Sequence, residues 1–139
     1  MIPVLFAIGI SFTVILMTIF LSKQFQSSLI GATALCSIAF IYVGFSLQGN
    51  PVNLIVMEIA IAAIFYFIAL IGYIRNVNII AFGILLHGVW DILHQDALVI
   101  KTNIPSYYPL FCSITDVILA VFFYWYFTMQ RRRNDLVNR

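Results

Sequence analysis

The order of apolar and polar residues along the chain divides it into five long apolar stretches. Each has about 20 residues, the length that an α-helix needs to cross the hydrocarbon core of a membrane. Polar or turn-forming residues separate them, including Lys23, Arg75 and the run Gln48-Gly49-Asn50-Pro51. The predicted membrane spans are residues 2–22, 28–47, 52–74, 77–94 and 107–129.

This pattern predicts an all-α, polytopic transmembrane bundle that forms a single domain over residues 1–139. An open sheet is excluded, because strand edges exposed to lipid cannot satisfy their backbone hydrogen bonds. A small β-barrel would need strands in which polar and apolar residues alternate, whereas these stretches are apolar on every face. Several connections are also too short to hold a second domain.

Composition excludes the main soluble classes. The chain is 63% hydrophobic and 9% charged, whereas soluble domains are about 45–50% apolar and about 25% charged. Disordered segments and nucleic-acid-binding domains need abundant polar or basic surface. A nucleic acid is therefore not an expected partner, and the expected surroundings of the chain are membrane lipid.

The basic residues predict the orientation of the chain, because short cytoplasmic loops carry an excess of Lys and Arg. With five spans, Lys23, Arg75, the triplet at residues 131–133 and Arg139 fall on one side, and Lys101 falls on the other. The prediction is an N-terminus outside the cell and a C-terminus in the cytoplasm.

Five ionisable residues fall inside the predicted spans, where such a residue is costly and indicates a functional site. They are Glu58, His87, Asp91, His94 and Asp116, with no Lys or Arg among them. Counting about 1.5 Å per residue from the span ends places Glu58, His87 and Asp116 near one depth in the outer half of the membrane. His87, Asp91 and His94 share one helix face, since their spacing is i, i+4 and i+7. We expect all five to meet in the bundle interior and His87 to contact Asp116.

Charge balance restricts what this interior can hold. Three ionised carboxylates without a basic partner are untenable at low dielectric, so protons or cations must compensate for them. Imidazole and carboxylate ligands suit zinc, iron or manganese, and the candidate metal ligands are His87, Asp91, His94 and Asp116. Asp91, Asp116 and Glu58 are the candidate catalytic carboxylates. A hydrogen-bonded network that locks the helices together or relays protons explains the same residues, and both readings stay open.

One stretch of the sequence carries a pattern seen elsewhere. Residues 87–94 read His-x-x-Trp-Asp-x-x-His, and residues 112–116 read Cys-x-x-x-Asp, with Pro105 and Pro109 between them. This pattern resembles a family of small bacterial integral membrane proteins that is catalogued as a domain of unknown function. The motifs cover roughly the last 60 residues, and the rest is similar in hydropathy. Members often carry a second histidine after the position of His94, where this chain has Gln95. The resemblance implies that the protein is located in the bacterial inner (plasma) membrane, and it suggests no particular activity.

Two functional hypotheses follow. The first is a membrane enzyme that acts on a lipid or isoprenoid substrate from the outer leaflet, with Asp91 and Asp116 as ligands or as an acid/base pair. His87 and His94 would then be ligands or proton carriers. The second is a non-enzymatic role as a small transporter component or an accessory subunit of a larger complex. A transporter of this size would need to form a homo-oligomer, and the sequence has no inverted repeat.

Overall fold

The computed structural model describes residues 2–95, 100 and 103–137 of the chain. Every regular element in these residues is an α-helix. The helices are α1 (Ile2–Leu21), α2 (Ser27–Ser46), α3 (Val52–Ile74), α4 (Asn78–His94) and α5 (Tyr108–Val137). The predicted all-α fold class with five helices is confirmed. The fifth helix continues past residue 129, where the apolar stretch ends, through the arginine triplet to Val137.

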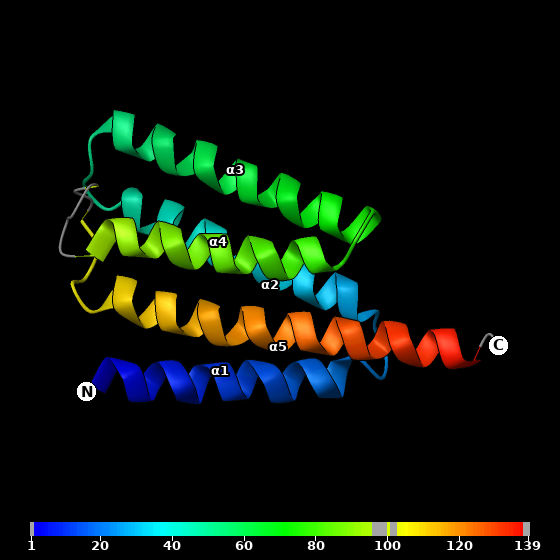
Figure 1. Cartoon of the computed structure of the whole chain (residues 1–139). Coiled ribbons are helices and arrows are strands. Elements are labelled where there is room, and N and C mark those ends of the chain that lie inside the picture. Colours follow the sequence, from blue (N-terminus) through cyan, green and yellow to red (C-terminus); the bar gives the residue numbers. More distant parts are fainter. Residues whose placement is uncertain (1, 96–99, 101–102, 138–139) are drawn as a thin grey trace.

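The five helices run alternately in opposite directions along one axis (Figure 1). The start of α1, the α2–α3 connection and the start of α5 lie at one end, which we call the N-terminal end. The α1–α2 and α3–α4 connections lie at the other end, where α5 projects beyond its neighbours. Helix α5 lies between α1 and α4, and α4 contacts α2, α3 and α5. Helix α4, which carries three of the ionisable residues, therefore has protein neighbours on three sides.

Four helices are long and apolar enough to cross a membrane: α1, α2, α3 and the part of α5 from Tyr108 to Arg133. Helix α4 is apolar but has 17 residues, at the lower limit of the roughly 17–25 residues that a span requires. Eight of its residues are buried, so protein rather than lipid covers much of its surface.

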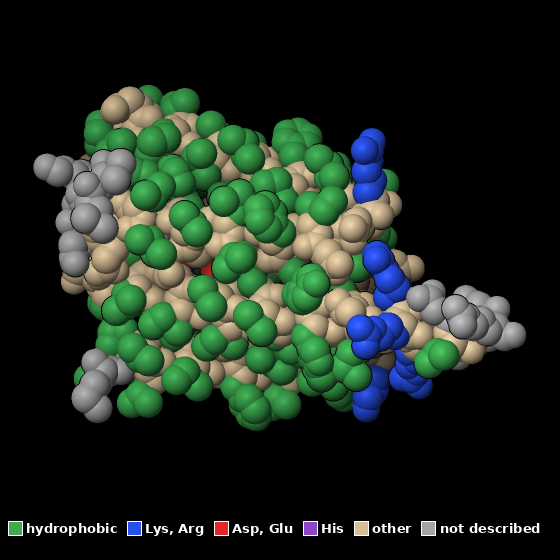
Figure 2. Space-filling view, in the orientation of Figure 1, with side chains coloured by type: hydrophobic (Ala, Val, Ile, Leu, Met, Phe, Trp, Pro, Cys, Tyr) green, Lys and Arg blue, Asp and Glu red, His purple; other side chains and the backbone are tan. Residues whose placement is uncertain are grey.

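Hydrophobic side chains cover the face of the bundle drawn in Figure 2, and basic side chains gather at one end of it. The basic residues that the structure describes are Lys23, Arg75 and Arg131–Arg133, and they define what we call the basic end. Lys101 and Arg139, on which the predicted orientation also depends, lie outside the described residues. An apolar surface of this extent is characteristic of a protein that is surrounded by lipid rather than water.

Two glycines let α4 approach its neighbours closely. A Cβ atom on Gly72 would lie 2.6 Å from Cγ1 and 3.0 Å from the backbone nitrogen of Ile80, so the tight α3–α4 turn leaves no room for a side chain. A Cβ atom on Gly83 would lie 2.6 Å from Cδ2 of Leu35 on α2. Small residues commonly allow such close helix contacts in membranes. These contacts hold α4 in the centre of the bundle and fix the level of its polar residues.

Candidate functional site

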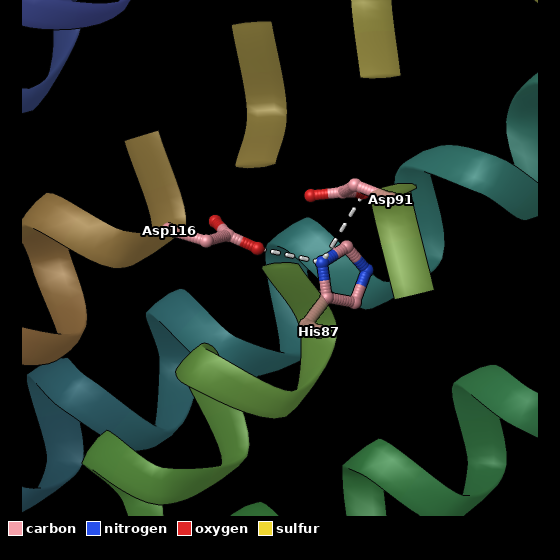
Figure 3. A group of neighbouring side chains, drawn as sticks. All are labelled: His87, Asp91 and Asp116. Atoms are coloured by element: carbon pink, nitrogen blue, oxygen red, sulfur yellow. Dashed lines mark hydrogen bonds and ion pairs between the residues drawn. The ribbon is translucent and has the colours of Figure 1, made fainter. Parts of the chain in front are cut away.

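Three ionisable side chains from α4 and α5 meet inside the bundle (Figure 3). His87 and Asp91 lie one turn apart on α4, and Asp116 faces them from α5. Nδ1 of His87 is 2.7 Å from Oδ2 of Asp116 and 3.7 Å from Oδ1 of Asp91. One potential ligand atom from each residue lies within 4.8 Å of the other two. We call these three residues the His87 cluster, and the predicted contact between His87 and Asp116 is confirmed.

A glycine on α4 makes this approach of α4 and α5 possible. A Cβ atom on Gly88 would lie 3.2 Å from Cβ of Asp116 and 3.5 Å from the backbone oxygen of Ser113. A larger residue at position 88 would therefore push α5 away from the cluster. Helical spacing supplies the rest of the geometry, since residues four apart project from the same face.

The His87 cluster is closed to solvent, and its hydrogen bonding is incomplete. The exposed fractions of His87, Asp91 and Asp116 are 2%, 0% and 1%. Both carboxylate oxygens of Asp91 are buried and have no hydrogen-bond partner among the residues that the structure describes. A buried polar group without a partner is costly and in native proteins usually has an explanation, such as a catalytic role or an ion. The cluster therefore has unused capacity to bind a proton or a cation.

The other two ionisable residues form a separate pair. Nε2 of His94 is 2.8 Å from Oε1 of Glu58 on α3, and Nδ1 of His94 is 3.1 Å from the backbone oxygen of Trp90. A carbonyl oxygen only accepts hydrogen bonds, so Nδ1 carries a hydrogen and donates it to Trp90. A single proton shared between Nε2 and Glu58 then makes the pair electrically neutral. We call Glu58 and His94 the His94 pair. Both ring nitrogens of His94 are hydrogen-bonded.

The structure thus divides the residues that the sequence grouped together. His87, Asp91 and Asp116 come together, whereas His94 and Glu58 are bonded to each other. Glu58 hydrogen-bonds to His94 and not to His87, which lies two turns earlier on α4. The predicted depth of Glu58 stays a prediction. Side chains on a helix tilt towards its N-terminus, so the side chains of Glu58 and His94 point towards each other along the antiparallel helices α3 and α4.

The ring of Tyr42 on α2 lies between the two groups, and the sequence analysis did not identify it. Its centroid is 4.6 Å from that of His94 and 5.8 Å from that of His87. Tyr42 is 1% exposed, and its hydroxyl has no hydrogen bond to any described residue. The available signal was the one tyrosine of the predicted span 28–47, in which the other polar side chains are serine and threonine.

Comparison with known proteins assigns the chain to a family. A family model described as "Family of unknown function (DUF6010)" matches residues 2–130. The chain belongs to the DUF6010 family. The match includes all five ionisable residues of the interior, and it confirms the resemblance seen in the sequence. No curated protein and no solved structure matches the chain.

In this DUF6010 member, the His87 cluster offers one imidazole nitrogen and two carboxylates around a common point. Such a mixed nitrogen and oxygen ligand set suits zinc, iron or manganese. Three protein ligands would leave further coordination positions for water or substrate. Without a metal, the same three groups could hold and transfer a proton between Asp91, His87 and Asp116.

Proposed function

We propose that this protein is an integral membrane enzyme in which His87, Asp91 and Asp116 bind one divalent cation. The observation that carries this proposal is the Asp91 carboxylate, which is fully buried with both oxygens unpartnered beside two further potential ligands. A bound cation would supply the missing interactions of Asp91. Zinc, iron and manganese are the candidate ions, since imidazole suits each of them.

Charge balance supports a divalent ion. Two ionised aspartates carry two negative charges, and a neutral imidazole adds none, so a divalent cation makes the cluster neutral. Neutrality matters because an uncompensated charge is very costly in a buried apolar site. To bind the ion, Nδ1 of His87 would give up its hydrogen bond with Asp116 and present its lone pair. A neutral metal-free cluster holds two protons that this ligand set lacks, so binding of a divalent ion would release both of them.

The surroundings of the cluster favour a lipid-like substrate, either a lipid or an isoprenoid compound. Exposed large hydrophobic side chains occur on all five helices and cover the face drawn in Figure 2. The cluster lies between α5, which is long and apolar enough to span a membrane, and the shorter apolar helix α4. A bound divalent ion would polarise an oxygen of the substrate or lower the pKa of a bound water. Whichever of Asp91 and Asp116 is less tightly bound to the ion would act as the acid or base.

We further propose that the chain is a single transmembrane domain of the bacterial inner membrane, with its basic end in the cytoplasm. The positions of Lys23, Arg75 and Arg131–Arg133 at that end support this orientation. A C-terminal fusion to a reporter that is active only in the cytoplasm should be active. Activity of a C-terminal fusion to a reporter that works only in the exported compartment would show that the orientation is the reverse.

A second candidate function is a metal-free proton-relay or structural network in a transporter component or accessory subunit. The observation that favours it is the direct contact of 2.7 Å between His87 and Asp116, which already satisfies part of the cluster. A protonated His87, one ionised aspartate and one protonated aspartate would also make the cluster neutral.

Metal content distinguishes the two functions. The purified full chain in detergent would be stripped with a chelator, incubated with zinc, iron(II) or manganese(II), desalted and analysed for bound metal. We expect one ion per chain for the wild type and for Glu58→Gln, and none for Asp91→Asn. The two variants make the same carboxylate-to-amide change, one in the His94 pair and one in the His87 cluster. A wild type that binds none of the three ions would overturn the metal-dependent function.

A lipid assay tests the enzyme part of the proposal. The metal-loaded wild type, reconstituted with a bacterial lipid extract, should convert a lipid or isoprenoid component that mass spectrometry can detect. The Asp91→Asn variant should leave the extract unchanged. Equal conversion by both proteins would show that the His87 cluster takes no part in the reaction.

A further inference from the structure

Tyr42 is a buried polar residue for which the metal site, as proposed above, has no role. Its side chain is among the largest that are fully buried in the protein, and its hydroxyl has no hydrogen bond within the part of the chain that the structure describes. A purely apolar packing role would be filled equally well by phenylalanine, which has no hydroxyl to leave unpaired. The hydroxyl therefore calls for an explanation.

The position of the hydroxyl supplies one. The ring of Tyr42 contacts His87 and His94, which flank Asp91 on the same face of α4, and neither the hydroxyl nor the Asp91 carboxylate has a hydrogen bond to any described residue. A tyrosine hydroxyl can donate, and an ionised carboxylate accepts at both of its oxygens. The two groups are thus complementary, and a hydrogen bond between them would satisfy both.

We propose that Tyr42 is a positioning residue for the metal ligand Asp91. This inference rests on the proposed function. When one oxygen of Asp91 binds the cation, the other accepts a hydrogen bond from the Tyr42 hydroxyl. Carboxylates that bind metals are in turn hydrogen-bonded by such outer partners, which orient them and strengthen metal binding. Tyr42 would bring α2 into a site whose direct ligands come from α4 and α5.

The ring of Tyr42 gives this arrangement its rigidity. Its ring centroid lies 4.6 Å from that of His94, 5.8 Å from that of His87 and 6.2 Å from that of Tyr108 on α5. These contacts hold the ring on three sides, so the hydroxyl has little freedom to turn away from Asp91. Removing the hydroxyl alone should therefore leave the packing intact.

The experiment compares Tyr42→Phe with Tyr66→Phe, a matched control at a tyrosine of α3 that is 46% exposed. Zinc alone is the probe, and its affinity for the purified full chain in detergent is measured by competition with a chromogenic chelator. We expect Tyr42→Phe to bind one zinc ion with an affinity about 10- to 100-fold below that of the wild type, the usual cost of losing an outer partner. Tyr66→Phe should bind like the wild type.

A spectroscopic readout separates positioning from a general structural effect. Cobalt(II) in the same site has an absorption spectrum that depends on its ligand geometry. We expect Tyr42→Phe to change that spectrum while the thermal stability of its metal-free form stays close to that of the wild type. Unchanged zinc affinity and an unchanged cobalt spectrum in Tyr42→Phe, with a wild type that binds metal, would overturn the role of Tyr42 alone. A wild type that binds no metal would overturn both this inference and the proposed function.

Discussion

His87 and His94 occupy the same face of α4, two turns apart, and each lies within 2.8 Å of a carboxylate from a neighbouring helix. Both contact the ring of Tyr42. They differ in what surrounds the contact. His94 uses one ring nitrogen for Glu58 and the other for the backbone of Trp90. Nδ1 of His87 faces two carboxylates, and Asp91 has no hydrogen bond to any described residue.

The two groups are both buried and have similar contact distances, but they differ in how many of their polar atoms are hydrogen-bonded. That difference is the better guide to which group binds a ligand. Buried polar groups stabilise a fold when every member is satisfied, and a partly satisfied group costs free energy. The His94 pair, in which both histidine ring nitrogens are hydrogen-bonded, joins α3 to α4. The His87 cluster is incomplete, which is the pattern expected of a site that binds something else.

The largest expected effect comes from breaking the His94 pair. His94→Leu leaves Glu58 buried without its partner, and this should lower the free energy of unfolding by about 3–5 kcal/mol. The double variant Glu58→Leu with His94→Leu should cost less than the sum of the two single changes, because no group is left unpaired. Denaturant titration in detergent measures all three variants. Effects that add to within about 0.5 kcal/mol would show that Glu58 and His94 do not act as a pair.

The next effect distinguishes the cluster from the pair through metal binding. Zinc at 100 times its dissociation constant should stabilise the wild type by about 2.7 kcal/mol, because it binds only the folded protein. The Glu58→Leu/His94→Leu variant should gain the same amount, since its ligands are intact, and Asp91→Asn should gain nothing. Thermal unfolding with and without zinc gives these values. Loss of zinc stabilisation in the double variant would place the His94 pair within the metal site.

A smaller effect tests the approach of α4 and α5. A Cβ atom on Gly88 would lie 3.2 Å from Cβ of Asp116, so Gly88→Ala should displace α5 slightly and cost about 1 kcal/mol of stability through overpacking. Zinc affinity should fall as well, because Asp116 moves away from His87. Gly44→Ala is the control, since a Cβ atom there would meet nothing within 4 Å. Equal zinc affinity in Gly88→Ala and Gly44→Ala would mean that the cluster tolerates the displacement.

The smallest expected change is that of Asp91→Asn in the metal-free protein. An amide cannot ionise, so the variant avoids the cost of a buried, unpartnered charge, and its free energy of unfolding should stay within about 1 kcal/mol of the wild type or exceed it. The same change in the His94 pair, Glu58→Gln, should destabilise more. A large loss of stability in Asp91→Asn would show that Asp91 has a structural partner after all.

The sequence by itself determined the five helices and the identity of the ionisable residues in the interior. Long apolar stretches require helices in a membrane, because only intrahelical bonds satisfy the backbone there. Helical spacing placed His87, Asp91 and His94 on one face, and the short connection between the fourth and fifth spans made His87 and Asp116 neighbours. These are local properties, which a single stretch of chain carries in its own residue order.

Only the tertiary structure decided which of these residues meet. The packing of α3 against α4 pairs Glu58 with His94, and the position of α2 places Tyr42 beside both histidines. Close contacts at Gly72, Gly83 and Gly88 hold α4 against its three neighbours, and such contacts fix the axial shift and rotation of each helix. Shift and rotation depend on side-chain packing between distant segments, and the hydrophobic pattern of one segment does not contain them.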